Sequence, residues 1–197
     1  MKPLNKTQIK NAIQDALKKG NWIIRADNDG EAYGGFRWNG VGEWTTAPDW
    51  NPAPECGGGL HGQDITHGGY VTGKRVVFCD TKGRHVVVGD DKVKVKAARI
   101  LCIGLPKIKK IKGSLSLRGC DLKGLTLPQT IGGSLYLSGC DLKGITLPQT
   151  IGGWLDLSGC DLKGLTLPQT IGGWLDLRGC DLSQIEIPQK LKSKVIA

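Results

Sequence analysis

One stretch of the chain, residues 113–192, constrains the fold more than any other because it consists of four ungapped copies of a 20-residue unit. The copies read GSLSLRGCDLKGLTLPQTIG, GSLYLSGCDLKGITLPQTIG, GWLDLSGCDLKGLTLPQTIG and GWLDLRGCDLSQIEIPQKLK. Self-similarity at a fixed period of this length is the signature of a repeat architecture, in which each unit buries its apolar face against its neighbours. We therefore expect four stacked coils, with the tail of the chain covering the last one.

Within each copy, a shorter period of five residues places an apolar residue on both sides of a polar one. The triplets Leu-Ser-Leu at 115–117 and Cys-Asp-Leu at 120–122 show this alternation, which is typical of a short strand with one buried face. Three such strands and a Gly-Gly corner would complete one coil, and coils stacked about 4.8 Å apart would pair their backbones. The pattern predicts a four-coil β-solenoid with an inward row of reduced thiols, here called the thiol ladder. The thiol ladder would consist of Cys120, Cys140, Cys160 and Cys180.

This pattern resembles a pentapeptide-repeat, right-handed quadrilateral β-helix, and it is similar to G-S-L-x-L-x-G arrays in phage and bacterial proteins. The resemblance covers residues 113–187, with the Thr-Ile-Gly-Gly segment of each copy one place out of register. A short leucine-rich-repeat solenoid is the alternative, because L-x-L-x-x-C-x-L also fits that signature. A leucine-rich repeat has one strand and usually a helical or 3₁₀ return, whereas Leu-Thr-Leu-Pro alternates like a strand. This difference favours the β-helix.

The residues before the repeat predict a small α+β domain over 1–91. An apolar stripe at helical spacing predicts an N-terminal helix over residues 5–19. Beyond it, short runs rich in Val, Ile, Phe and Trp alternate with turn residues and predict strands. The predicted fold class is therefore mostly β, a small α+β domain followed by the β-solenoid. The remaining divisions are a basic capping or transition segment at 92–112, the four coils at 113–192 and a tail at 193–197.

Positive charge is concentrated in the segment before the repeat. The net charge of the chain is +9, whereas the seven basic and seven acidic residues of 113–192 cancel. Lysines on a terminal strand protect a sheet edge, and a basic cluster is also typical of nucleic-acid binding. No phosphate-binding loop, zinc knuckle or aromatic stacking platform accompanies the cluster, so edge protection is the preferred interpretation. The candidate anion-binding residues are Lys92, Lys94, Lys96, Arg99, Lys107, Lys109, Lys110 and Lys112.

A Pro- and Gly-rich loop at 47–69 holds the side chains that could carry chemistry. The candidates for catalysis or metal binding are Cys56, His61 and His67. Their spacing matches no standard zinc pattern, and a Cys–His nucleophile pair requires a proximity that spacing alone does not establish. The preferred interpretation is structural, with Cys56 as a core residue and His61 bonded to the backbone. No cofactor or metal is expected.

The strings GGFRW, VGEW and ECGGGLHG resemble an N-terminal domain of phage and prophage proteins. The pattern of that domain is G-F-Q-[YW], then V-G-x-x-[YW], then C-x-x-G-[FL]-H-[AG]. The resemblance covers residues 33–62, and in that family a repetitive solenoid often follows. It implies a viral or mobile-element origin and no particular chemistry, and this chain lacks the cysteine often found shortly after the histidine. The matching positions are Gly35, Phe36, Trp38, Val41, Gly42, Trp44, Cys56, Gly59, Leu60 and His61.

Function is best sought where the four copies differ. Trp154 and Trp174 stand where the first two copies have serine, and aromatic residues dominate protein-binding hot spots. We therefore expect a non-catalytic factor, encoded by a phage or prophage, that binds a host protein and inhibits a defence complex. The alternatives are a toxin-like or small-ligand-processing enzyme that uses Cys56 and His61, and nucleic-acid binding through residues 92–112. The candidate protein-binding residues are Trp154, Trp174, Tyr136, Asp156 and Asp176.

The sequence predicts a cytoplasmic protein, in the host cell if the chain is viral. It has no run of about 18 apolar residues that could span a membrane, so no membrane partner is expected. The N-terminus lacks the apolar core of a signal peptide. Seven cysteines, an odd number, without an export signal favour reduced thiols. A homodimer through the repeat is a further interpretation of the tryptophans.

Overall fold

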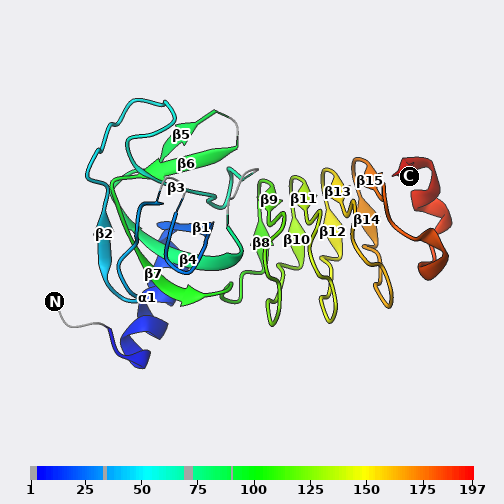
Figure 1. The fold of residues 1–197 in the computed structure, drawn as a ribbon, viewed down its shortest axis with the longest axis horizontal. Coiled ribbons are helices and arrows are strands. Elements are labelled where there is room, and N and C mark those ends of the chain that lie inside the picture. Colours follow the sequence, from blue (N-terminus) through cyan, green and yellow to red (C-terminus); the bar gives the residue numbers. More distant parts are fainter. Residues whose placement is uncertain (1–3, 33–34, 69–72, 90) are drawn as a thin grey trace. The chain divides into compact units, whose positions relative to one another are not determined.

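The computed structural model describes residues 4–32, 35–68, 73–89 and 91–197, and these are mostly β with few helices (Figure 1). Residues 33, 34 and 69, which belong to the segments singled out in the sequence, lie outside the described residues. The chain divides into two compact units, Met1–Pro106 and Lys107–Ala197. Among the described residues, no helix has both the length and the apolar character needed to cross a membrane.

The division after Pro106 differs from the expected boundaries of the basic segment 92–112. β6 (Lys92–Val95) and β7 (Ala97–Ile103) are strands of the two sheets in the first unit. They belong there because Val93, Val95 and other apolar side chains that alternate with the basic ones are buried in its core. The second unit takes only the end of the segment, including β8 (Lys110–Ile111).

The N-terminal helix α1 (Lys6–Lys19) confirms the helix expected at 5–19. Asn5 and Gln8 form a capping box, in which each side chain accepts a hydrogen bond from the backbone N–H of the other, at 2.9 Å. Gly20 ends the helix in the left-handed conformation, with φ 72°, and donates its N–H to the carbonyl of Ala16. The buried side of α1 contacts β4 (Arg75–Lys82) and β7.

Two antiparallel sheets make up the rest of the first unit. One has the strand order β1-β4-β7-β2, with β1 at Trp22–Asp27 and β2 at Trp44–Thr46. The other has the order β3-β6-β5, with β3 at Leu60–Gly62 and β5 at Val86–Val88. Every residue of β1 is buried, and an isolated bridge between Ile24 and Gln63 links β1 to the chain just after β3. The region around β3 is thereby held against β1.

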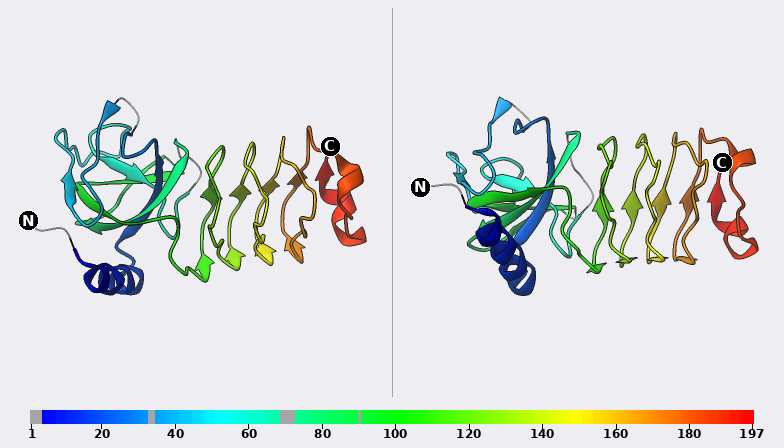
Figure 2. Two further views of the ribbon diagram at one scale, coloured as in Figure 1. Left: turned by 60° about the horizontal axis from the view of Figure 1, so that its bottom comes forward. Right: turned by 90° about the horizontal axis from the view of Figure 1, so that it is seen from below.

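The second unit consists of two parallel ladders in which every strand pairs with the equivalent segment 20 residues away (Figures 1 and 2). One ladder has the order β14-β12-β10-β8, and the other has the order β16-β15-β13-β11-β9. The registers Thr130↔Thr150 and Leu135↔Leu155 therefore reproduce the sequence period directly. The further bounds are β9 Leu115–Ser116, β10 Thr130–Ile131, β11 Leu135–Tyr136, β12 Thr150–Ile151, β13 Leu155–Asp156, β14 Thr170–Ile171, β15 Leu175–Asp176 and β16 Val195–Ile196.

Each complete copy contributes two strands of two residues, not the three strands of three residues expected from the period of five. The Cys-Asp-Leu and Leu-Thr-Leu triplets lie in turns and extended segments outside the ladders. The aspartate explains part of this difference, because Asp121 Oδ1 accepts the backbone N–H of Lys123 at 2.9 Å and forms a local turn. The Thr-Ile segment, which is one place out of register with the pentapeptide pattern, forms the strands β10, β12 and β14.

The interior of the second unit is built from most of the leucines and cysteines predicted to point inward, and from the isoleucines of the Thr-Ile segments. Leu115, Leu117 and Ile131, for example, are completely buried. The thiols add a specific contact, because Cys140 Sγ donates to the Leu117 carbonyl at 3.0 Å and Cys160 Sγ repeats the bond one copy later. Burial raises the pKa of Cys140 to about 11, so its thiol stays protonated. All seven cysteines are free thiols.

The C-terminal tail covers the last copy, as expected. After Asp181 the fourth copy leaves the repeat pattern and forms two 3₁₀ turns, η2 (Leu182–Gln184) and η3 (Gln189–Lys194). β16 then pairs in parallel with β15, again 20 residues away. Lys194 Nζ donates to the carbonyls of Ile171 and Gly172, which the end of the other ladder would otherwise leave without a strand partner.

Candidate functional site

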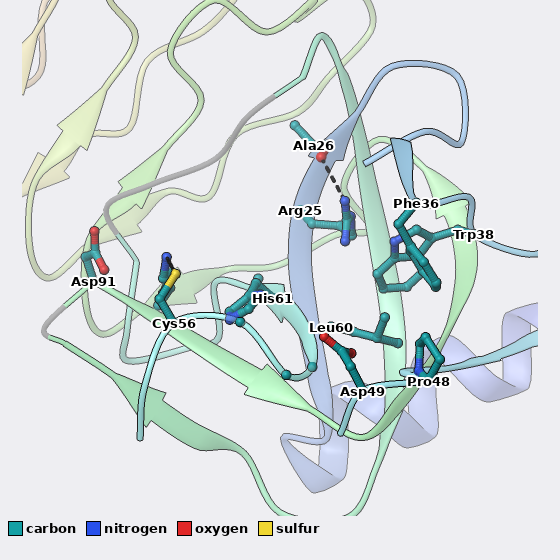
Figure 3. A pocket seen from close by; sticks show the side chains of 15 residues that line it. Arg25, Ala26, Phe36, Trp38, Pro48, Asp49, Cys56, Leu60, His61 and Asp91 are labelled. Atoms are coloured by element: carbon teal, nitrogen blue, oxygen red, sulfur yellow. Dashed lines mark hydrogen bonds between the residues drawn. The ribbon is translucent and has the colours of Figure 1, made fainter. Parts of the chain in front are cut away.

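Two of the three chemical candidates, Cys56 and His61, line one cavity of about 840 Å³ in the first unit (Figure 3). His61 lies on β3, and Cys56 lies in the preceding Gly-rich loop. His67 is not part of this lining. The expected structural role of Cys56 in the core is wrong, because its side chain is exposed.

The opposite wall of the cavity comes from β1 and the segment after it. Figure 3 shows Arg25 beside the ring of Trp38, with Phe36 next to them. The guanidinium carbon of Arg25 lies 4.2 Å from the centre of the Trp38 ring, which is a cation–π contact. Arg25 was not among the predicted site residues. The available signal was a charged residue inside the otherwise apolar run of β1.

Three polar atoms on these walls have no hydrogen-bond partner. Among the described residues, Arg25 Nε, Trp38 Nε1 and His61 Nε2 are the buried side-chain nitrogen and oxygen atoms that lack one. Buried polar groups in proteins are nearly always paired, so each exception requires an explanation. Here all three exceptions belong to residues that line the same cavity.

Lysines make this region positive. Lys92 Nζ donates to Cys56 Sγ at 3.3 Å, and the buried Lys94 donates to the carbonyls of Glu55 and Gly57 at 2.9 Å each. Burial lowers the pKa of His61 to about 4, assisted by the charges of Lys92, Lys94 and Arg25 and opposed by Asp49. His61 is therefore neutral at pH 7. The two carboxylates on the lining are Asp49 and Asp91.

His67 belongs to a separate hydrogen-bonded cluster around Asp64. Asp64 Oδ1 accepts the backbone N–H groups of Thr66 and His67 at 2.8 Å, and Nδ1 of His67 lies 3.1 Å from the same oxygen. Asp64 Oδ2 lies 3.1 Å from Nδ1 of His85, whose Nε2 lies 3.0 Å from Thr81 Oγ1. These bonds hold the pKa of Asp64 well below its usual range despite its burial. No group of three or more His, Cys, Asp and Glu residues is placed to hold a metal ion in the described part of the chain.

The basic segment 92–112 does not form one uniform anion-binding surface. Lys94 is completely buried, and Arg99 forms an ion pair with Asp80 at 2.8 Å, so the prediction that both face an anionic partner is wrong. The reason is that β6 and β7 are internal strands whose basic side chains are used by their own unit. The candidates with exposed side chains are Lys96, Lys107, Lys109, Lys110 and Lys112.

The second unit carries the residues predicted to bind protein. The side chains of Trp154 and Trp174 are exposed, with 47% and 45% of their surface accessible. The backbone N–H of Trp154 donates to Ser134 Oγ at 3.0 Å, and its ring lies against Gly173 of the next copy. These contacts fix where the Trp154 side chain leaves the ladder.

Asp156 and Asp176 are not the exposed acids that the sequence predicted. Both are largely buried, because each lies under an arginine: Arg118 Nη2 is 3.0 Å from Asp156 Oδ2, and Arg178 Nη2 is 2.6 Å from Asp176 Oδ2. The Arg118 guanidinium also lies 4.1 Å from the centre of the Tyr136 ring. Burial opposes ionisation of Asp156, but hydrogen bonds from the Ser158 hydroxyl and N–H, together with Arg118, lower the pKa of this carboxyl group. For Asp176, the hydrogen bonds from Arg178 lower the pKa against a smaller opposing effect of burial. The surface therefore presents arginine and tyrosine together with the tryptophans.

Differences between the copies fall almost entirely on one side of one ladder. The first three copies differ at four of 20 positions, and three of these flank or alternate with the buried leucines of β9, β11 and β13. The fourth is a Leu-to-Ile exchange. We call these three positions, in each of the four copies, the variable face; within it, Ser116, Asp156 and Asp176 are largely buried. The variable face comprises Ser114, Ser116, Arg118, Ser134, Tyr136, Ser138, Trp154, Asp156, Ser158, Trp174, Asp176 and Arg178.

Comparison with known proteins gives no match: no family model, no curated protein and no solved structure matches the chain.

Proposed function

We propose that the chain is a non-catalytic protein-binding factor whose binding site is the variable face. The observation that carries this proposal is the separation between a constant scaffold and a variable surface. The inward and turn residues repeat almost unchanged through three copies, whereas the residues beside and between the leucines of one ladder vary among serine, arginine, tyrosine, tryptophan and aspartate. A repeat that served only as a spacer would have no reason to vary on one face alone.

The chemistry of the variable face supports a protein partner. Tryptophan, tyrosine and arginine are the residue types that dominate the energetics of protein interfaces. The exposed rings of Trp154 and Trp174 occupy equivalent positions on β-ladder neighbours, since Leu155 pairs directly with Leu175. Short strands tied on both sides lose little conformational freedom when a partner binds.

For the second unit we propose a right-handed β-solenoid of the pentapeptide-repeat kind. Two ladders with a constant 20-residue register support a coiled path in which each copy returns to the position above its predecessor. Two ladders are less compatible with a leucine-rich repeat, whose units carry one strand each. Such a rod would present the variable face as a flat strip.

The proposed partner is a protein of a host cell. The resemblance of residues 33–62 to a domain of phage and prophage proteins supports this class of partner, and inhibition of a host defence complex in the cytoplasm is the corresponding activity. The variable face lies on a rigid repeat scaffold, and such a surface is better suited to inhibiting a partner by binding than to catalysing a reaction on it. Nucleic acid is the weaker proposal, because Lys94 and Arg99 of the basic segment are already engaged.

The test returns both tryptophans to the residue that the first two copies carry. We expect the double variant Trp154→Ser/Trp174→Ser to lose the host protein that the wild-type chain captures from lysate. The control is Lys143→Ala/Lys163→Ala, which changes exposed lysines of the second and third copies at a position that is lysine in each of the first three copies. Recovery of the same host protein by the tryptophan variant would contradict the proposal. Sedimentation velocity provides a second check, since a wild-type dimer that the tryptophan variant dissociates would make this face a self-interface.

A further inference from the structure

The cavity of the first unit contains an arginine buried without an acidic partner. Arg25 is only 8% exposed, and no carboxylate of the described residues forms an ion pair with it. Within the part of the chain that the structure describes, its Nη2 has a single long hydrogen bond, 3.4 Å to the Ala26 carbonyl, and its Nε has no partner. A buried cation without a directly paired carboxylate is costly, and burial lowers the pKa of Arg25 even though the charge of Asp27 acts in the opposite direction. The contact with the Trp38 ring compensates only part of that cost.

Two further side-chain nitrogens that line the same cavity have no hydrogen-bond partner among the described residues, Trp38 Nε1 and His61 Nε2. The indole nitrogen of Trp38 can only donate a hydrogen bond, and it is buried with no acceptor within the described ranges of the chain. His61 Nε2 also lacks a hydrogen-bond partner among the residues that the structure describes, and His61 lines the same cavity as Arg25 and Trp38. A guanidinium and an indole N–H both require an acceptor, and an anionic oxygen is the acceptor that satisfies both best.

We propose that this pocket binds a small organic anion, in which a carboxylate or phosphate group is joined to a flat apolar body. The acidic group would be held by Arg25, with the Trp38 N–H and His61 as further partners. The apolar body would lie against Phe36 and Leu60, which line the same space. A cavity of about 840 Å³ is within the usual range for such ligands, whose sites combine apolar walls with a few polar anchors.

The charges around the cavity agree with an anion at this end. Lys92, Lys94 and Arg25 each act to lower the pKa of His61, which shows that positive potential prevails over that of Asp49 at the imidazole. A bound anion would oppose these charges and stabilise the imidazolium. Binding should therefore raise the pKa of His61 from about 4, whereas a bound cation would lower it further.

The test uses four probes that share a ring and differ in charge: phenyl phosphate, benzoate, benzamide and benzylammonium. In the full chain labelled with ¹⁵N, we expect both anions to shift the Trp38 indole N–H signal and to bind at least about tenfold more tightly than the other two. The relative affinity of phenyl phosphate and benzoate then identifies which acidic group the site prefers. We also expect bound phenyl phosphate to raise the pKa of His61, followed through its ring proton signals.

Substitution of the arginine separates a binding role from a structural one. We expect Arg25→Lys, in a chain shown to be folded by its melting temperature, to weaken phenyl phosphate binding at least about tenfold. Arg99→Lys is the matched control, because Arg99 also lies over a tryptophan, 4.7 Å from the centre of the Trp44 ring, but away from the cavity. If Arg25→Lys does not fold, His61→Gln should weaken the anions and leave benzamide unchanged.

Three results would overturn the inference. One is equal binding of benzamide or benzylammonium and the anions, and another is unchanged affinity in the folded Arg25 and His61 variants. The third is the absence of any shift of the Trp38 signal up to about 10 mM of either anion, a concentration that corresponds to negligible affinity for a preformed site. None of these results bears on the variable face, which belongs to the other unit.

Discussion

Replacement of Gly152 by alanine tests the close approach of consecutive copies in the second unit. A Cβ atom on Gly152 would overlap the carbonyl oxygen of Gly132 in the preceding copy. The φ of Gly152 is not in the left-handed region, so the obstacle is space and not backbone conformation. Because the overlapping atom belongs to the backbone, the methyl group can be accommodated only if the two strands move apart.

The size of the effect follows from the bonds at this corner. The N–H of Gly152 donates to the Ile131 carbonyl at 2.9 Å, and the N–H of Gly153 donates to the Gly133 carbonyl at 2.8 Å. Loss of two such bonds costs about 2 kcal/mol in total, since each contributes about 1 kcal/mol net. Forcing a methyl group into a close-packed contact adds about 1–3 kcal/mol. We therefore expect Gly152→Ala to destabilise the second unit by about 3–5 kcal/mol.

Gly144→Ala is the matched control in the same copy. Gly144 has φ 75° and no atom within 4 Å of an added Cβ, so alanine meets only the left-handed backbone penalty, about 1 kcal/mol. The assay is amide hydrogen exchange read on peptides from 107–197, because the chain has two units and a single global unfolding curve would mix them. Equal effects of the two variants, or a neutral Gly152→Ala, would refute the proposed register of the copies.

Three further outcomes follow from the contacts of the first unit and the thiols. Arg75→Met should lower the free energy of unfolding by about 3 kcal/mol or more in chemical denaturation, because the fully buried Asp27 loses both of its hydrogen bonds to the guanidinium. The control Arg37→Met breaks the exposed ion pair with Glu31 and should cost less than about 1 kcal/mol. The pKa of His61 is about 4 in the folded chain and 6.5 in the unfolded chain, so the unfolded state binds more protons between these pH values. Up to about 3 kcal/mol of the free energy of unfolding is therefore lost as pH falls from 6.5 to 4. His61→Gln should remove this part of the pH dependence, and an unchanged dependence of the unfolding free energy on pH would contradict the assignment. Iodoacetamide should modify Cys56 in the native chain before the buried members of the thiol ladder, and mass spectrometry of the peptides that shows the reverse order would be inconsistent with the structure.

The repeat made most of the second unit predictable. The 20-residue period predicts the register of both ladders, and the alternation of leucine with polar residues predicts the buried leucines, but not the burial of Ser116, Asp156 and Asp176 between them. The period of five overestimated the number of strands, because Asp121 and its equivalents capture a backbone N–H in a local turn. Alternation of apolar and polar residues indicates which side of a segment is buried. It does not indicate whether the backbone of that segment pairs with a neighbouring strand.

The candidate pocket was predictable only in part. Cys56 and His61 were predicted as candidates for catalysis or metal binding because a thiol and an imidazole occur close together near a Gly-rich loop, and both line the cavity. Arg25 and Trp38 come from other segments, and their approach depends on how β1 pairs with β4 and how the bridge at Ile24 holds the region of β3. Such long-range pairings leave no local pattern in a single sequence.

Buried charged residues are the feature that the sequence predicted least well. They fall into two groups, those with partners within the fold and one that lacks them. Asp156 and Asp27 are buried with arginine partners, so their charges are satisfied within the fold and need no ligand. Lys94 is buried with two carbonyl partners and is likewise satisfied. Arg25 is buried with neither a carboxylate nor a full set of acceptors among the described residues. Because a folded chain rarely retains such a cost without compensation, this arginine is the place where the first unit is incomplete without an anion.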